Sequence, residues 1–262
     1  MTIIDTHTHF HDPQAAGDLL WPSPGDAHYR TCLPATYRAE VGTRPVVAIE
    51  TSPRRKDDLR LMRLAASDPL ICAYVSNLQP LEPGFEARLT EAKQDAKWRG
   101  LRLRPIAAFD LAAPGLLAAL DRLDGHGHVE LGLQHADSLA ALRALCLALP
   151  HIRFVLTHCA RPAQAGAGSY DYRPFEGLEN LYVKLSPPKE EDMAQAPVRV
   201  QLAGHVARLV GTLSPARLMF GSNWPVAPKP AAFEGWLAGV VSDAGGEVAQ
   251  VYTHTAQDLY RP

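Results

Sequence analysis

The stretch IIDTHTHFHDP, residues 3–13, begins with two isoleucines and then carries a histidine at every second position. Successive side chains of a strand point to opposite faces, so His7 and His9 share a face if this stretch is a strand. Asp12 and Pro13 predict that the strand has ended by that point. We therefore interpret residues 2–8 as a strand whose carboxyl end presents imidazole groups.

Seven further short apolar or β-branched stretches follow, and Ala- and Leu-rich stretches of helical period lie between most of them. The expected strands are residues 2–8, 45–50, 70–76, 98–104, 128–134, 152–157, 180–186 and 216–221. The expected helices are residues 55–66, 85–94, 115–123, 138–148 and 198–211, with a last one near 246–259. This alternation predicts an α/β fold, a single (β/α)8 barrel domain over residues 1–262. The segment 11–44, rich in Pro and Gly, is then a long first loop.

Composition excludes several classes of function. The 262 residues are 47% hydrophobic, which is enough for one large core. Lys and Arg number 26 against 28 Asp and Glu, so nothing indicates a nucleic-acid or anionic-membrane partner. Four cysteines without C-x-x-C spacing and no long apolar run favour a cytoplasmic protein with reduced thiols. We expect a small-molecule substrate, and the oligomeric state stays open.

The polar residues at the strand ends predict where this substrate binds. Catalytic groups of a (β/α)8 barrel lie at the carboxyl ends of the strands, where alternate residues point inward. We assume that, in each strand, the alternate residues that share a face with the polar ones point into the barrel. In the second and sixth strands this assumption also places Val46, Ala48, Phe154 and Leu156 inside. The residues expected to meet at the mouth are His7, His9, Glu50, Arg102, Arg104, Gln134, His158, Lys184 and Asn223.

Several of these strand ends together resemble a known family. The motifs are IIDTHTHFHDP, GLRLRP, IRFVLTHCARP, NLYVKLS, RLMFGSNWP and TAQDLY, in this order along the chain. They resemble the amidohydrolase superfamily, in the branch that includes 2-pyrone-4,6-dicarboxylate lactonase and the sugar lactonases. The resemblance implies a (β/α)8 barrel, hydrolysis of a cyclic ester, and a site built from His7, His9, His158 and an acid on strand eight.

The chain departs from the pattern of this family at that acid. Relatives read F-G-S-D-W-P, whereas this chain has Asn223, which does not act as a base. Thr157 stands where relatives carry an Asp, and Gln134 where metal-dependent members place a histidine. These changes argue against a binuclear metal centre. No cofactor is expected to be required, although a single divalent metal such as zinc on His7, His9 and His158 stays open.

The remaining residues receive roles from their chemistry. Arg102 and Arg104 are expected to hold a substrate carboxylate or polarise the lactone carbonyl, with Lys184 as a further positive charge. A histidine moves the proton. Glu50, Gln134 and Trp224 complete the expected substrate-binding set. The residues expected at the surface are His126, His128 and His135. Cys159 is not expected to act as a nucleophile with His158, because adjacent strand residues face opposite ways.

We therefore expect a hydrolase that opens a small carboxylated or polyhydroxylated lactone. The second hypothesis is a lactone isomerase, in which a hydroxyl of the substrate replaces the activated water and makes Asn223 tolerable. A mononuclear metal-dependent decarboxylase or hydratase and a catalytically silent binding protein are further alternatives. Proton release separates hydrolysis from isomerisation, and elemental analysis identifies the metal enzyme.

Overall fold

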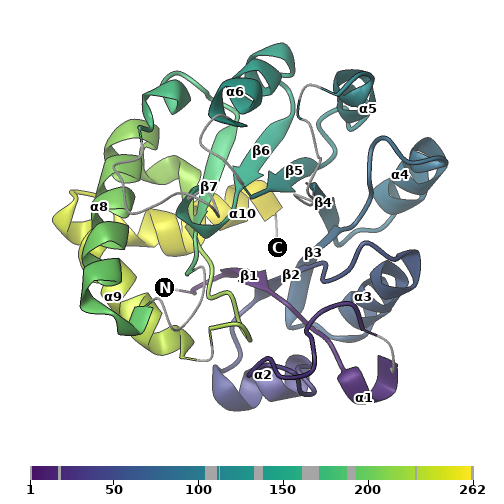
Figure 1. Ribbon diagram of the computed structural model, residues 1–262, viewed down its shortest axis with the longest axis horizontal. Coiled ribbons are helices and arrows are strands. Elements are labelled where there is room, and N and C mark those ends of the chain that lie inside the picture. Colours follow the sequence, from purple (N-terminus) through teal and green to yellow (C-terminus); the bar gives the residue numbers. More distant parts are fainter. Residues whose placement is uncertain are drawn as a thin grey trace.

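The strands of the protein form one closed sheet. The computed structural model describes residues 2–16, 19–103, 111, 113–132, 138–160, 171–187, 193–227 and 229–260. Eight parallel strands follow one another in chain order, and helices surround them (Figure 1). The last strand closes onto the first, because the Asn223 amide donates to the His7 carbonyl and the His9 amide donates to the Trp224 carbonyl, each at 2.9 Å. The predicted (β/α)8 barrel is confirmed.

All eight expected strands are present, each of them shorter than the sequence indicates. They are β1 (Asp5–Thr8), β2 (Val46–Ile49), β3 (Ile71–Ser76), β4 (Trp98–Leu103), β5 (His128–Leu131), β6 (Arg153–Leu156), β7 (Leu181–Leu185) and β8 (Leu218–Phe220). Short strands place more of the chain in the loops at the strand ends, where the functional residues are expected.

The helices include three that the sequence analysis does not predict, α1 and α2 in the expected first loop and α9. The segment holding α2 is rich in Pro and Gly, and Gly235 and Gly239 weaken the helical pattern of α9. The helices are α1 (Pro13–Ala16), α2 (Pro34–Glu40), α3 (Arg55–Ser67), α4 (Phe85–Lys93), α5 (Leu116–Asp121), α6 (Ser138–Ala148), α8 (Ala196–Leu213), α9 (Pro230–Asp243) and α10 (Thr255–Tyr260). The short helical turns are η1 (His158–Ala160), η2 (Arg173–Phe175), η3 (Pro215–Arg217) and the π-helical η4 (Gln250–His254).

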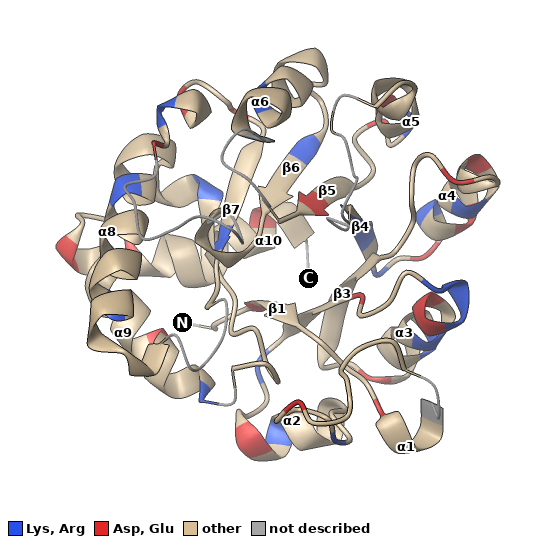
Figure 2. Ribbon diagram, in the orientation of Figure 1, with Lys and Arg blue, Asp and Glu red and all other residues tan. Residues whose placement is uncertain are grey.

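Charged residues of both signs are interspersed over the outer helices, as Figure 2 shows for α2, α3 and α4. In the part of the chain that the structure describes, no helix combines the length and the apolar character needed to cross a bilayer.

The inward face of β2 differs from the prediction. Val46 and Ala48 pack in the large apolar cluster that includes the surrounding helices, whereas Val47 and Ile49 belong to the smaller cluster inside the barrel. The prediction that Val46 and Ala48, the strand residues that alternate with Glu50, point into the barrel is therefore wrong. Glu50 still reaches the mouth, because it lies one residue beyond the end of β2, where strand alternation no longer applies.

A charged cluster occupies the middle of the barrel. One oxygen of the Glu130 carboxylate, Oε1, accepts hydrogen bonds from Lys184 Nζ at 2.6 Å, Tyr260 Oη at 2.7 Å and His128 Nε2 at 3.0 Å. Lys184 also donates to the Thr6 carbonyl at 2.5 Å. The expectation that His128 lies at the surface is wrong: its side chain is 2% exposed. Four elements, β1, β5, β7 and α10, meet at this one cluster.

Glu130 and Lys184 are a buried ion pair at neutral pH. Burial alone would raise the pKa of Glu130, but the Lys184 ammonium and the His128 hydrogen bond outweigh it and lower this pKa to about 2. Burial lowers the pKa of Lys184 to about 8 despite the Glu130 charge, so the ammonium is kept at pH 7. Neither side chain has access to solvent that would compensate for the loss of its partner.

Glu130→Leu should lower the free energy of unfolding by about 3–5 kcal/mol, because it leaves the Lys184 ammonium buried without a counter-charge. The double variant Glu130→Leu/Lys184→Met removes both charges and should recover at least half of that loss. Urea unfolding followed by circular dichroism measures both. The matched control is Glu86→Leu, which breaks the exposed ion pair with Arg122 and should cost about 1 kcal/mol or less. Equal instability of the single and double variants would contradict this role.

Candidate active site

His7 and His9 project from the end of β1 into the mouth of the barrel. The His7 ring centroid lies 4.9 Å from that of His9 and 4.9 Å from that of His158. The close approach of β8 makes this packing depend on Gly221, since a Cβ there would lie 2.7 Å from the Cβ of His7. Both ring nitrogens of His7 are buried and lack a hydrogen-bond partner among the described residues.

The hydrogen bonding of His9 fixes its tautomer. His9 Nδ1 lies 3.2 Å from the Ile49 carbonyl oxygen, which accepts only, so Nδ1 carries the proton. Nε2 of the neutral ring then keeps its lone pair. The ring is 5% exposed and also contacts Trp21 edge to face, with centroids 5.2 Å apart. A neutral imidazole with one free acceptor nitrogen is able to take up a proton.

His158 reaches the mouth through a turn and not through strand alternation. Phe154 and Leu156 of β6 pack toward the helices and Val155 packs inside, so the predicted inward parity of this strand is wrong. His158, Cys159 and Ala160 all adopt positive φ, between 52° and 57°. Such a run of left-handed residues is rare outside glycine and typical of functional sites.

Ser186 at the end of β7 holds this turn. Its Oγ accepts a hydrogen bond from the His158 amide at 3.1 Å and lies 3.1 Å from His158 Nδ1. The argument that placed Cys159 opposite His158 does not apply, because neither residue lies in a strand. Cys159 is nevertheless fully buried in the helix-facing cluster, with Sγ 3.6 Å from the Ser186 carbonyl oxygen.

Arg102 and Glu50 pair across the mouth. Leu101 and Leu103 of β4 pack toward the helices, so Arg102 faces inward as the sequence predicts. Its guanidinium lies 3.6 Å from the Glu50 carboxylate, and its side chain is 15% exposed while that of Glu50 is 1% exposed. The pair leaves a guanidinium at the cavity, held in place by a buried carboxylate.

Asn223 follows β8 and adopts a φ of 56°, a conformation that asparagine tolerates better than most residues. Its side-chain Nδ2 donates a 2.8 Å hydrogen bond to the Pro187 carbonyl, and its backbone carbonyl accepts from the Ala227 amide. The amide therefore links the loops after β7 and β8. An aspartate would not donate to Pro187.

His9, Glu50, Arg102, His158 and Asn223 surround one cavity of about 330 Å³ at the carboxyl ends of the strands, whereas His7 is fully buried and does not line it. The first loop contributes Trp21 and His28, which the sequence analysis places in that loop without assigning them to the site. An aromatic and a histidine in an otherwise Pro- and Gly-rich loop were the available signal. The lining residues are His9, Trp21, Asp26, His28, Glu50, Thr51, Arg102, His158, Asn223 and Val226.

The other predicted site residues lie elsewhere. Lys184 is fully buried, with its ammonium bound by Glu130 and the Thr6 carbonyl. Trp224 is fully buried between Phe10 and Tyr37, so its assignment to substrate binding is wrong: the ring packs in the helix-facing core. Arg104, Gln134 and His135 lie outside the described residues, and His126 is exposed as expected.

His7, His9 and His158 are neutral at pH 7. Burial, together with the nearby Arg102 and Lys184 charges, lowers the pKa of His158 to about 3. Burial also lowers the pKa of His7 and of His9 well below the ordinary value. Among the described residues that line the cavity, the neutral imidazoles of His9 and His158 therefore lie beside one fixed cation, Arg102.

A metal ion does not fit this arrangement well. The orphaned nitrogens of His7 would suit a metal ligand, and His9 Nε2 is available. Within the described ranges, however, no three His, Cys, Asp or Glu side chains converge so as to hold an ion.

Known proteins resemble the chain over almost its whole length. A family model described as amidohydrolase matches residues 4–261. An L-fucono-1,5-lactonase from Burkholderia ambifaria is 27% identical over 257 residues, covering 94% of this chain and 85% of the relative. A zinc-bound amidohydrolase structure from Burkholderia multivorans is 21% identical, with a TM-score of 0.82 and coverage of 100% and 99%. A Pseudomonas putida structure named as a 2-pyrone-4,6-dicarboxylic acid hydrolase is 23% identical, with a TM-score of 0.75 and coverage of 99% and 97%.

The free energy of unfolding should fall as the pH drops below about 6.5. The mouth histidines have lowered folded-state pKa values, whereas in the unfolded chain they titrate near 6.5, so the unfolded state binds more protons in between. Each contributes a slope of up to about 1.4 kcal/mol per pH unit. His158→Asn, which suits the positive φ, should reduce the slope measured by urea unfolding between pH 7.5 and 5. The exposed His126→Asn should not, and equal slopes in wild type and His158→Asn would refute the assignment.

Proposed function

The chain belongs to the amidohydrolase family, and on this premise we propose that it hydrolyses a small lactone carrying a carboxylate or several hydroxyl groups. The observation that carries the proposal is one cavity at the mouth that joins a fixed cation, Arg102, to the free acceptor nitrogen of a neutral His9. Its support from outside is the similarity to two relatives named L-fucono-1,5-lactonase, 27% and 24% identical.

Arg102 holds the substrate. A guanidinium offers parallel N–H donors that match a carboxylate, or stabilise the oxyanion that forms when a carbonyl is attacked. Glu50 keeps the guanidinium in place from behind at 3.6 Å. Because Arg102 is 15% exposed, it is reachable from the cavity while remaining largely shielded from solvent screening.

His9 takes the proton of the attacking water. The water oxygen forms a bond with the lactone carbonyl carbon and its proton passes to His9 Nε2. The ring C–O bond then breaks, and the His9 imidazolium returns this proton to the leaving ring oxygen. His158, 3.1 Å from Ser186 at Nδ1, is the second imidazole at the cavity and, being neutral, positions the substrate by hydrogen bonding and supplies no proton. A positioned base of this kind contributes about 10²–10⁴-fold to the rate.

Lactone isomerisation is the second candidate, and Asn223 is the observation that favours it. An amide bound to the Pro187 carbonyl is no base, so water at that side of the cavity is not activated by it. A hydroxyl group of the substrate, already held beside the carbonyl, needs less activation than water does. The two reactions differ in product, since only hydrolysis releases acid.

A panel of sugar-acid and pyrone lactones should give proton release with the wild-type protein, measured with a pH indicator. Arg102→Ala should raise KM at least tenfold and change kcat less, because Arg102 binds the carboxylate in ground and transition states alike. Arg102→Lys should fall between the two, since it keeps the charge and loses the fork. Arg122→Ala, at an exposed ion pair, is the control. Absence of acid release from every lactone would contradict the hydrolase proposal. An unchanged KM in Arg102→Ala would show that Arg102 does not bind the carboxylate.

Asn223→Asp separates the two candidates. In an isomerase, the new carboxylate should activate bound water, so that ring-opened acid appears beside the isomerised lactone in the mass spectrum. In a hydrolase that uses His9, the product should stay the same and only the acid limb of the pH–rate profile should move. Loss of the Pro187 hydrogen bond should cost about 1–2 kcal/mol in either case. Asn223→Gly tolerates the positive φ and controls for that loss, and acid gained equally by the Gly variant would contradict the water-activation argument.

A further inference from the structure

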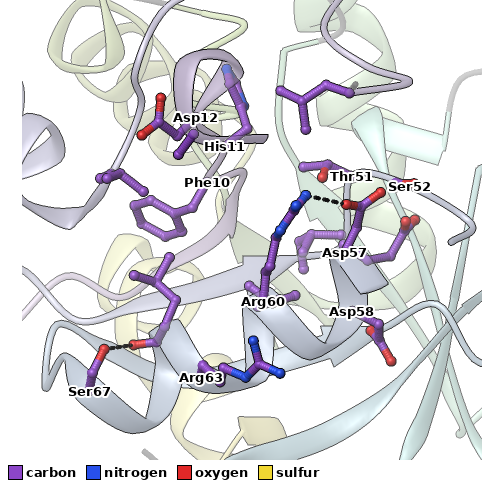
Figure 3. Close-up of a pocket in the computed structure, with 17 residues that line it drawn as sticks. Phe10, His11, Asp12, Thr51, Ser52, Asp57, Asp58, Arg60, Arg63 and Ser67 are labelled. Atoms are coloured by element: carbon purple, nitrogen blue, oxygen red, sulfur yellow. Dashed lines mark hydrogen bonds and ion pairs between the residues drawn. The ribbon is translucent and has the colours of Figure 1, made fainter. Parts of the chain in front are cut away.

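A second cavity, of about 470 Å³, lies beside the mouth, between the chain that follows β1 and helix α3 (Figure 3). Apolar side chains form much of its wall, and several of these are nine-tenths buried. Protein interiors leave few voids larger than a water molecule, whereas cavities of 300–1,000 Å³ typically hold small ligands. The apolar side chains of this wall include Phe10, Leu33, Leu61 and Leu64.

Two consecutive residues after β2 separate this cavity from the mouth. Glu50 and Thr51 line both spaces, while the mouth residues His9, His158 and Arg102 line only the mouth. The second cavity is therefore a distinct space that shares one wall with the candidate active site.

Each carboxylate that lines this cavity has a partner among the described residues, whereas one of its two lining arginines has no ion pair with them. The carboxylates are Asp12, which accepts from Thr31, Glu50, which pairs with Arg102, Asp57 and Asp58. The Asp57 carboxylate is neutralised by Arg54 at 3.0 Å and by Arg60 at 2.8 Å. Asp58 accepts a hydrogen bond from the Asn77 amide at 3.0 Å. Arg63 also lines the cavity, and its exposed side chain makes no ion pair with any residue that the structure describes (Figure 3).

We propose that this cavity binds a small molecule with an apolar body, such as an aromatic ring or a short alkyl chain, and a single anionic group that pairs with Arg63. The leucines and Phe10 desolvate the body, and the guanidinium at the rim keeps the anionic group facing solvent. The site is separate from the lactone site and does not depend on the proposed reaction.

Titration calorimetry with 4-phenylbutyrate tests the proposal, with 4-phenylbutanamide as the uncharged counterpart. A compound of about a dozen non-hydrogen atoms should bind wild type with a Kd at or below about 1 mM. The amide should bind at least threefold more weakly. Leu64→Trp fills the cavity and should weaken 4-phenylbutyrate at least tenfold, whereas Leu147→Trp, at an exposed leucine of α6, should not.

Arg63→Glu keeps the test decisive if Leu64→Trp fails to fold, because Arg63 is exposed. It should weaken 4-phenylbutyrate at least fivefold and leave the amide unchanged, while Arg122→Glu should affect neither. No binding by wild type, or full binding by Arg63→Glu, overturns the proposal. Loss of binding in Arg102→Ala also overturns it, since the compound would then occupy the mouth. Because binding and not turnover is measured, failure here leaves the lactonase proposal standing, and absence of lactone hydrolysis leaves this one standing.

Discussion

A charge buried inside a closed barrel must find its partner there, and the Glu130 carboxylate meets this constraint with Lys184, His128 and Tyr260. Burying an ion without a partner costs several kcal/mol, so the pairing holds β5, β7 and α10 in one relative position. Lys184 adds β1 through the Thr6 carbonyl. Above this layer, the positions of the mouth residues follow from strand register, since β2, β4, β6 and β8, which carry most of them, each pair with a strand that meets at this centre.

The mouth itself combines two kinds of support. Arg102 projects from within a strand, and the buried Glu50 holds its guanidinium. His158 and Asn223 lie just after strands, in left-handed conformations that hydrogen bonds to Ser186 Oγ and to the Pro187 carbonyl, respectively, hold in place. The rigid strands thus fix the position of each group, and the strained turns fix the direction of its side chain. Both contributions are expected of a site that must be precise and adaptable.

The eight strands and the barrel were predictable, because hydrophobic period and the alternation of elements are local properties of the sequence. Which face of a strand points inward was predictable only where the polar residue used to assign that face itself lies within the strand. This prediction succeeded for Arg102, and it failed for Val46 and Phe154, because the nearby polar residues Glu50 and His158 lie past their strand ends. The burial of His128 and the core position of Trp224 depend on partners more than a hundred residues away in sequence, such as Tyr260 and Tyr37. No local pattern carries that information.

The closure of the barrel has a consequence for the order in which the chain folds. Strand β1 takes hydrogen bonds from β2 on one edge, but the other edge is completed by Asn223 and Trp224, and the Ile4 amide donates to the Tyr252 carbonyl. These contacts close loops of more than two hundred residues. The chain therefore loses conformational entropy on closing the loop before the contacts stabilise the fold. During synthesis, one edge of the first strand therefore stays unpaired until nearly the whole chain has left the ribosome. We expect the imidazoles that this strand carries to be the last part of the mouth to become fixed.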